Sequence, residues 1–226
     1  MKTTLICKGE LEQADLKNGT VADTELLVFG FQSVGEVSYE QELNGETAIF
    51  EKVARLSLEI GGTVVCGLRT NALGHVRNSA LVASNGQILG VSDAVYAIDE
   101  EVGAGACFRV YDTKQGRIGV AVGTDLYFPE TAKALTDFGC DYIVCPFSKT
   151  QGVTESVLAR AYAFSYGIPV LFCGDGYSLI AGEKGDVLYA AAENGKYDVK
   201  LKSGTEYHLI TRRRRGFAAY RKSENC

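Results

Sequence analysis

The chain has 226 residues, of which 46% are hydrophobic, and its formal net charge at pH 7 is −5. This length suits a single α/β domain with a large buried core, and the hydrophobic content excludes an intrinsically disordered chain. The mild acidity argues against nucleic acid as a partner, and no apolar run reaches the length of a signal peptide or a membrane span, so we expect a cytoplasmic protein without membrane association.

Short runs of β-branched and aromatic residues recur along the whole chain and predict strands. The predicted strands are 3–7, 25–31, 62–70, 78–85, 86–91, 108–113, 117–123, 141–147, 169–174, 177–182, 186–192 and 197–201. Asn85-Gly86 separates two of these runs and is a strong signal for a tight hairpin turn. Lys184-Gly185-Asp186 predicts a second hairpin.

Three windows between the strands predict helices, at 44–62, 128–141 and 153–169. Each contains apolar residues at helical spacing or a helix-start proline, and each ends near a glycine. The apolar residues of the first window share one face: Ile49, Val53, Leu56 and Ile60. Those of the third recur at the same spacing and predict its apolar face: Val157, Ala161 and Phe164.

The order of these elements predicts the fold class. The segments "LTDFGCDYIVCPF" and "AFSYGIPVLFCG" each read helix, glycine turn and nearly continuous apolar strand, which is typical of a sheet covered on both faces. The hairpins indicate that the sheets are mixed. We therefore expect an α/β protein with two stacked mixed sheets and helices outside each, forming one domain over residues 1–226.

The same segments, in the same order, resemble the carbon–nitrogen hydrolase (nitrilase and amidase) superfamily. The most specific stretch is "VYDT", "GRIGV", "DLYFPE" and "GCDYIVCPF", read along the chain. The resemblance covers nearly the whole chain and implies a four-layer α-β-β-α sandwich. The tail from about residue 205, with its basic block Arg212–Arg215, is similar to the Arg-rich C-terminal segment of that family. The basic block taken alone indicates a solvated or interface-lining segment, or an anion-binding patch.

The resemblance also implies a Glu–Lys–Cys triad, in which a thiolate attacks carbon, a carboxylate moves the proton and an ammonium group stabilises negative charge. None of the three side chains is present where the local motifs place it. Phe31 stands at the Glu position of a "V-F-P-E" block, Ala94 (or at best Asp93) at the Lys position, and Gly123 at the Cys position. We therefore expect the usual chemistry to be absent.

Other residues near the expected cleft are candidates for a ligand pocket: Thr124, Glu100, Glu101, Cys145 and Cys173. Thr124 is also explained by turn chemistry, and the two glutamates by a solvated loop. Four of the seven cysteines lie near the ends of predicted strands: Cys7, Cys66, Cys145 and Cys173. One interpretation is that they are small buried core residues. The other is that Cys145 or Cys173 is a replacement nucleophile. No spacing of these residues matches a metal or cofactor motif, so we expect neither group.

Three functions remain open at this point. The first is a homodimeric binding or assembly module without triad catalysis, whose ligand is a small amide, amine or carboxylate. The second is a C–N hydrolase with a rebuilt site, in which Cys145 or Cys173 attacks and Glu100 or Glu101 is the acid/base. The third is a regulatory subunit that pairs with an active homologue.

Overall fold

A computed structural model of the chain describes residues 1–11, 21, 23–99, 101–149 and 153–200. The predicted C-terminal segment from residue 205, with its arginine block, lies outside the described residues. Among those described, no helix is both long and apolar enough to cross a bilayer.

The first sheet is mixed, as predicted, and has seven strands. Its strands are β1 (Lys2–Ile6), β2 (Leu26–Phe29), β3 (Glu36–Ser38), β4 (Thr63–Ala72), β5 (His75–Ser84), β6 (Gln87–Asp93) and β13 (Gly195–Asp198). They are ordered β13-β1-β2-β4-β5-β6, with β3 paired to β4. β1, β2 and β4 run parallel, whereas β5, β6 and β13 are antiparallel to their neighbours.

The second sheet is also mixed and has six strands. They are β7 (Arg109–Thr113), β8 (Gly116–Val120), β9 (Tyr142–Lys149), β10 (Val170–Asp175), β11 (Tyr177–Ala181) and β12 (Val187–Ala191). The order is β12-β11-β10-β9-β8-β7, in which β8, β9 and β10 are parallel. The carboxyl ends of these three strands therefore meet at one edge of the sheet.

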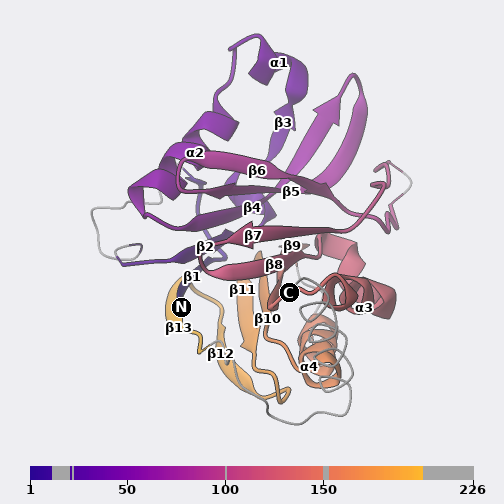
Figure 1. Cartoon of the computed structure of the whole chain (residues 1–226). Helices are drawn as coiled ribbons and strands as arrows, with labels where there is room; N and C mark the ends of the chain where they lie inside the picture. Colours follow the sequence, from indigo (N-terminus) through magenta and orange to yellow (C-terminus); the bar gives the residue numbers. More distant parts are fainter. Residues whose placement is uncertain (12–20, 22, 100, 150–152, 201–226) are drawn as a thin grey trace, which may run out of the picture.

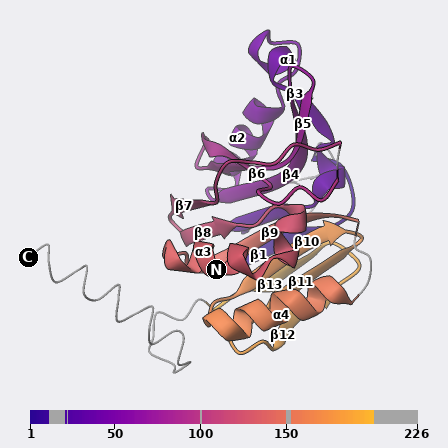
Figure 2. The ribbon, with the colours of Figure 1, turned by 90° about the vertical axis from the view of Figure 1, so that its right-hand side faces the viewer.

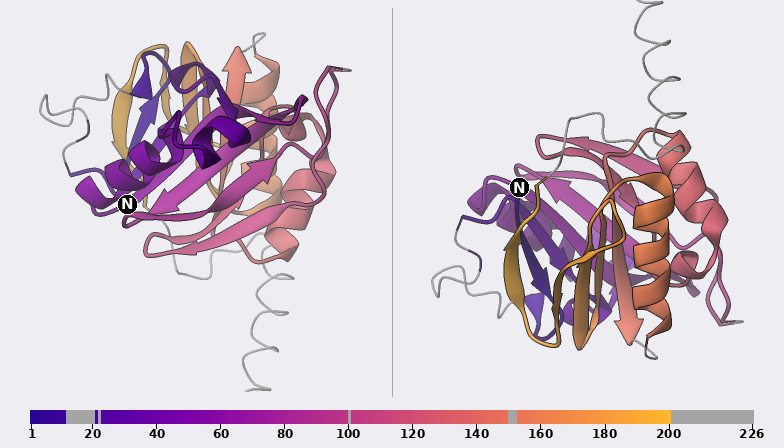
Figure 3. Two further views of the ribbon diagram at one scale, coloured as in Figure 1. Left: turned by 90° about the horizontal axis from the view of Figure 1, so that it is seen from above. Right: turned by 90° about the horizontal axis from the view of Figure 1, so that it is seen from below.

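Helices cover the outer face of each sheet, which gives the four expected layers (Figure 1). The outer helices are α1 (Tyr39–Leu43) and α2 (Ile49–Glu59) beside the first sheet, and α3 (Pro129–Asp137) and α4 (Thr154–Tyr166) beside the second. Figure 2 shows α4 along the second sheet, and the right-hand view of Figure 3 shows α3 beside α4. Three apolar clusters hold these layers together, one between the sheets and one under each helical layer.

Two hairpins follow the sequence prediction. Asn85 and Gly86 take φ values of 48° and 85° between β5 and β6, the left-handed geometry of a tight hairpin turn. Gly185, with φ of 75°, turns the chain between β11 and β12. The last strand, β13, begins at Gly195, two positions before the predicted start, and the short elements β3 and α1 were not predicted.

The apolar face of α4 was predicted wrongly. Val157 and Phe164 are 53% and 51% exposed, whereas Ala159, Tyr162 and Ala163 are buried against the second sheet. This helix carries apolar residues on both sides, and small alanines allow the helix to approach the sheet closely. Tyr162 packs inward beside these alanines, whereas Val157 and Phe164 remain on the outer surface of the described structure.

Candidate functional site

The turn after β8 is the first part of the candidate site. The strand is followed by the 3-10 helix η4 (Gly123–Tyr127) and then by α3. Gly123 has a φ of 52°, in the left-handed region that L side chains rarely adopt. A Cβ placed on Gly123 would meet no heavy atom within 4 Å. The turn thus opens onto free space, but the residue there has no side chain that could act in it.

Asp125 fastens this turn to the segment that follows β6. The residue is 1% exposed, and Oδ1 accepts hydrogen bonds from the backbone N–H groups of Val95 and Tyr96, each at 2.9 Å. Oδ2 accepts a further bond, at 3.2 Å, from the N–H of Val122. Burial raises the pKa of Asp125 to about 6, although the three N–H donors act to lower it.

Thr124 and Tyr96 also connect the turn to the segment that follows β6. The Thr124 hydroxyl donates to the carbonyl oxygen of Tyr96, so it is already engaged by the backbone. The Tyr96 ring stacks on Phe128, with ring centroids 4.0 Å apart. This environment agrees with turn chemistry for Thr124, and we assign it a structural contact.

Phe31 occupies the space between the two sheets. It begins the short 3-10 helix η3 (Phe31–Ser33) after β2 and is 8% exposed. A Cβ added to Gly67 of β4 would lie 2.6 Å from Cδ2 of Phe31 and 3.0 Å from Cβ of Pro146 in β9. The ring is therefore wedged between strands of opposite sheets, and it closes the corner that the sequence assigns to the triad acid.

Ala94 belongs to the same apolar cluster as Phe31. It is 1% exposed and packs in the inter-sheet core together with Val122, the residue before Gly123. The residues at the predicted acid and cation positions are thus core residues. Neither of them presents a charged or hydrogen-bonding side chain to the turn at Gly123.

A carboxylate that the sequence did not single out lies beside Phe31. Asp175 is the last residue of β10, and its Oδ1 accepts a 3.0 Å hydrogen bond from the N–H of Gln32. A Cβ on Gly30 would come within 2.7 Å of the same oxygen. The only local signal for this group is the Asp of "CGDG" directly after a buried strand.

The two candidate nucleophilic thiols do not converge. Cys145 packs under the outer helices of the second sheet, whereas Cys173 packs between the sheets, where Cys7 also lies. Both are fully buried, and burial raises the pKa of each thiol well above its ordinary value. Cys173 Sγ donates to the carbonyl oxygen of Ile6 at 3.3 Å. These environments favour packing over nucleophilic attack.

The structure describes only one of the two candidate loop glutamates. Glu101 is exposed, and its backbone N–H donates to the side chain of Asp99 in a surface turn. Glu100 lies outside the described residues. No group of three or more His, Cys, Asp or Glu residues in the described ranges could hold a metal ion.

Comparison with known proteins identifies the family. Residues 22–208 match the family model for carbon-nitrogen hydrolases. The chain is a carbon–nitrogen hydrolase family member. It is 23% identical over 203 residues to the probable nitrilase C965.09 of Schizosaccharomyces pombe, covering 81% of this chain and 75% of that protein.

Solved structures share the fold of this family member. Nit3 of Saccharomyces cerevisiae, from branch 10 of the nitrilase superfamily, superposes with a TM-score of 0.72 at 18% identity, covering 89% of this chain and 91% of its own. The NitN amidase of Nesterenkonia sp. AN1 gives a TM-score of 0.73 at 19% identity, covering 98% of both chains. The four-layer architecture expected from the sequence is thus the fold of the nitrilase superfamily.

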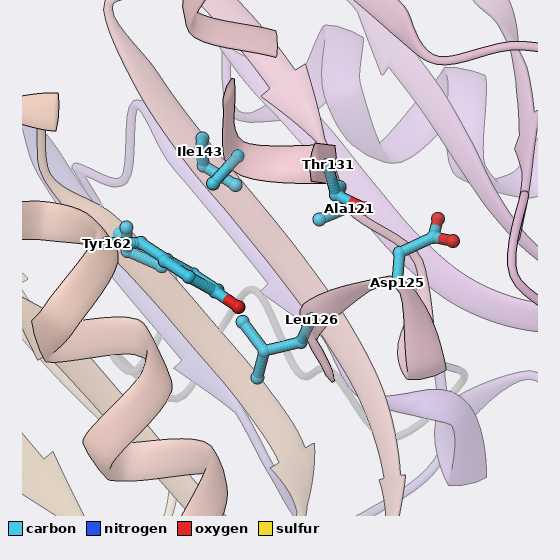
Figure 4. Close-up of a pocket in the computed structure, with 8 residues that line it drawn as sticks. Ala121, Asp125, Leu126, Thr131, Ile143 and Tyr162 are labelled. Atoms are coloured by element: carbon cyan, nitrogen blue, oxygen red, sulfur yellow. The ribbon is translucent and has the colours of Figure 1, made fainter. Parts of the chain in front are cut away.

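A small cavity lies behind the turn of this carbon–nitrogen hydrolase family member (Figure 4). It is lined by Ala121, Asp125, Leu126, Thr131, Ala132, Ile143, Tyr162 and Val170. In Figure 4 the Asp125 carboxylate points away from Leu126 and from the Tyr162 hydroxyl. The volume of the cavity is about 10 Å³, which is room for one water molecule. The cavity is therefore too small for an amide substrate.

Proposed function

We propose that this carbon–nitrogen hydrolase family member binds a small molecule without hydrolysing it through a Glu–Lys–Cys triad, and that it acts as a homodimer. The observation that carries the proposal is Gly123. It holds the left-handed φ of 52° at the turn between β8 and α3 and faces open space, yet it has no atom that could attack carbon.

The residues at the other two triad positions cannot fill their roles either. Proton transfer needs a titratable group, and charge stabilisation needs a donor or cation aimed at the reacting atoms. Phe31 and Ala94 supply neither, and both are buried in the inter-sheet core. A protein that has the family fold but apolar residues at these two positions is better suited to binding a ligand than to acyl transfer.

The rebuilt hydrolase has less support. A replacement thiol must ionise and reach substrate, but Cys145 and Cys173 are fully buried, and their pKa values are raised by burial. They also lie on opposite faces of the second sheet.

The outer face of α4 supports the homodimer. Val153, Val157 and Phe164 are 75%, 53% and 51% exposed and follow one another along this face. Large apolar side chains gathered on one exposed helix face are typical of an interface between proteins. A two-fold dimer would place this face against its own copy, so that one apolar surface covers the other.

Turnover of model substrates tests the proposal. Purified protein is incubated with propionamide, propionitrile and an N-carbamoyl amino acid, and released ammonia is compared with a mock preparation from the same host. We expect no release above the mock. Hydrolysis that persists through purification and is lost in Cys145→Ser or Cys173→Ser would overturn the proposal in favour of a rebuilt site.

A further inference from the structure

Asparagine is followed directly by glycine at four places in the chain: Asn18, Asn44, Asn85 and Asn194. Such pairs are especially prone to spontaneous deamidation, because glycine has no side chain to hinder attack of its backbone nitrogen on the asparagine amide. Asn18 lies outside the described residues. The other three pairs have the same local chemistry, so differences in their reactivity must come from their surroundings in the fold.

The pair Asn85-Gly86 is held in the tight turn between β5 and β6. The Asn85 amide donates to Ser84 Oγ at 3.1 Å and accepts from Lys114 Nζ at 3.3 Å. The N–H of Gly86, whose nitrogen would attack, donates to Ser57 Oγ at 2.9 Å. Attack would break this last bond and turn the Asn85 amide away from its two partners.

The pair Asn194-Gly195 is held at the start of β13. Oδ1 of Asn194 accepts from the N–H groups of Cys7 and Lys8 at 2.8 and 2.9 Å. Nδ2 of Asn194 donates to the carbonyl oxygen of Lys8 at 2.7 Å. Gly195 itself pairs with Leu5 in the first sheet. The amide is thus bonded at both its oxygen and its nitrogen, and the backbone of the glycine belongs to a strand.

The pair Asn44-Gly45 is exposed in the connection between α1 and α2. No described residue forms a hydrogen bond with the side-chain amide of Asn44. A Cβ on Gly45 would meet no heavy atom within 4 Å, so the space around the pair is open. The N–H of Gly45 donates to the carbonyl oxygen of Glu42 at 3.2 Å. A single hydrogen bond of the reacting groups therefore opposes attack at Asn44, whereas several oppose it at Asn85 and Asn194.

We propose that Asn44 is a site of spontaneous covalent modification. A bond forms between the backbone nitrogen of Gly45 and Cγ of Asn44, and the side-chain amide group leaves as ammonia together with the proton of that nitrogen. The product is a cyclic imide. Water then adds to one of its two carbonyl carbons and breaks the C–N bond there, which leaves either aspartate or isoaspartate. Water is the only co-reactant.

The modification adds a negative charge where the fold disfavours one. Asn44 is the C-terminal cap of α1, and a helix C-terminus favours cations over anions. The Glu42 carboxylate, two positions earlier, accepts the N–H groups of Ile49 and Phe50 at 2.8 and 3.1 Å. These bonds hold the start of α2. Modification of Asn44 should therefore loosen α1 and the first turn of α2 while leaving the two sheets intact.

A time course on the full chain tests the proposal. Native protein is incubated at pH 8 in oxygen-18 water, which labels each newly formed carboxyl group, and is then digested in ordinary water for peptide mass mapping. Label should appear at Asn44 at least about tenfold faster than at Asn85 or Asn194, because those pairs must first break several hydrogen bonds. In guanidinium chloride the three pairs should react at similar rates, since only the fold distinguishes them.

Two variants separate the effect of the fold from that of the dipeptide. Asn44→Gln keeps an amide but must close a larger ring, so it should abolish label at position 44 and leave the other pairs unchanged. Ser57→Ala removes the acceptor of the Gly86 N–H and should accelerate labelling at Asn85 alone. Native labelling of Asn85 or Asn194 as fast as that of Asn44 would overturn the proposal. So would an Asn44 that stays unlabelled in the native protein while the denatured chain reacts.

Discussion

The Phe31 ring lies so close to the backbone of Gly67 that a Cβ on this glycine would come within 2.6 Å of Cδ2 of the ring. The two residues belong to η3 and β4, and Pro146 of β9 closes the other side. This contact joins the two sheets at the position that the sequence motifs assign to the triad acid.

Gly67→Ala should destabilise the protein by about 1–3 kcal/mol, because the added methyl group overpacks a rigid core. Equilibrium unfolding in guanidinium chloride measures the effect. Gly103→Ala is the matched control, since a Cβ there meets its nearest neighbour at an ordinary 3.6 Å. Combining Gly67→Ala with Phe31→Leu should recover part of the loss, and additive effects of the two changes would contradict the proposed contact.

Substitutions at Gly123 separate backbone strain from crowding. Gly123→Ala should destabilise by about 1 kcal/mol through the left-handed φ alone, because the space around it is open. Gly123→Asn should cost less, since Asn tolerates this conformation better than other non-glycine residues. Free energies of unfolding compare the two variants, and an Asn variant less stable than the Ala variant would indicate crowding instead.

The stability of the protein should depend on the protonation of Asp125. Its pKa of about 6 in the folded state exceeds the ordinary 3.8, so the folded state binds this proton more tightly than the unfolded state. The contribution is fully present below pH 4 and is lost as pH rises through 6, by about 3 kcal/mol. Asp125→Asn cannot titrate, so the stability difference between wild type and variant should shift by that amount between pH 4 and pH 7. A constant difference would show that the three N–H donors hold the pKa near its ordinary value.

Alkylation of the native protein tests the environments of the thiols. Cys107 is exposed and should react with iodoacetamide quickly, whereas the buried Cys66, Cys140, Cys145 and Cys173 should react only after unfolding. Peptide mass mapping over a time course assigns each site. Fast labelling of Cys145 or Cys173 in the native protein would support the hypothesis of a hydrolase with a rebuilt site.

A charge introduced on the exposed face of α4 should disrupt the proposed dimer. Phe164→Asp should convert the proposed dimer to a monomer in sedimentation equilibrium, because an isolated carboxylate in an apolar interface is strongly unfavourable. Leu58→Asp, on the exposed side of α2 and 62% exposed in the wild type, should leave the mass unchanged. A monomeric wild type would refute the dimer, and a dimer that survives Phe164→Asp would place its interface elsewhere.

Local patterns were sufficient to predict most of the fold. The Asn85-Gly86 turn, the start of α3 at Pro129 and the alternation of strands with helices all depend on residues near one another in the chain. The face of α4 could not be predicted this way. Its apolar residues lie on both sides, and only the folded structure shows that Ala159, Tyr162 and Ala163 face the sheet.

The candidate site was predictable in part. The sequence motifs assigned Phe31, Ala94 and Gly123 to the triad positions, and this assignment stays a prediction. They gave no signal for the contact of Asp175 with Gln32, which joins residues 143 positions apart. The thiols illustrate the same limit. Cys145 pairs with Phe172 across neighbouring strands, so Cys173 stands one position further and faces the opposite side. This register is a property of the folded sheet.

The wedge formed by Phe31 makes the positions that the motifs assign to the triad unequal as sites for engineering. A cysteine at position 123 would place its Cβ in open space, although the φ of 52° there strains any residue other than glycine. A carboxylate could not be placed at position 31 without leaving a hole between the sheets and an unpaired charge inside it. An engineer who wishes to install a triad at these positions would therefore have to redesign the packing around Gly67 before changing the turn.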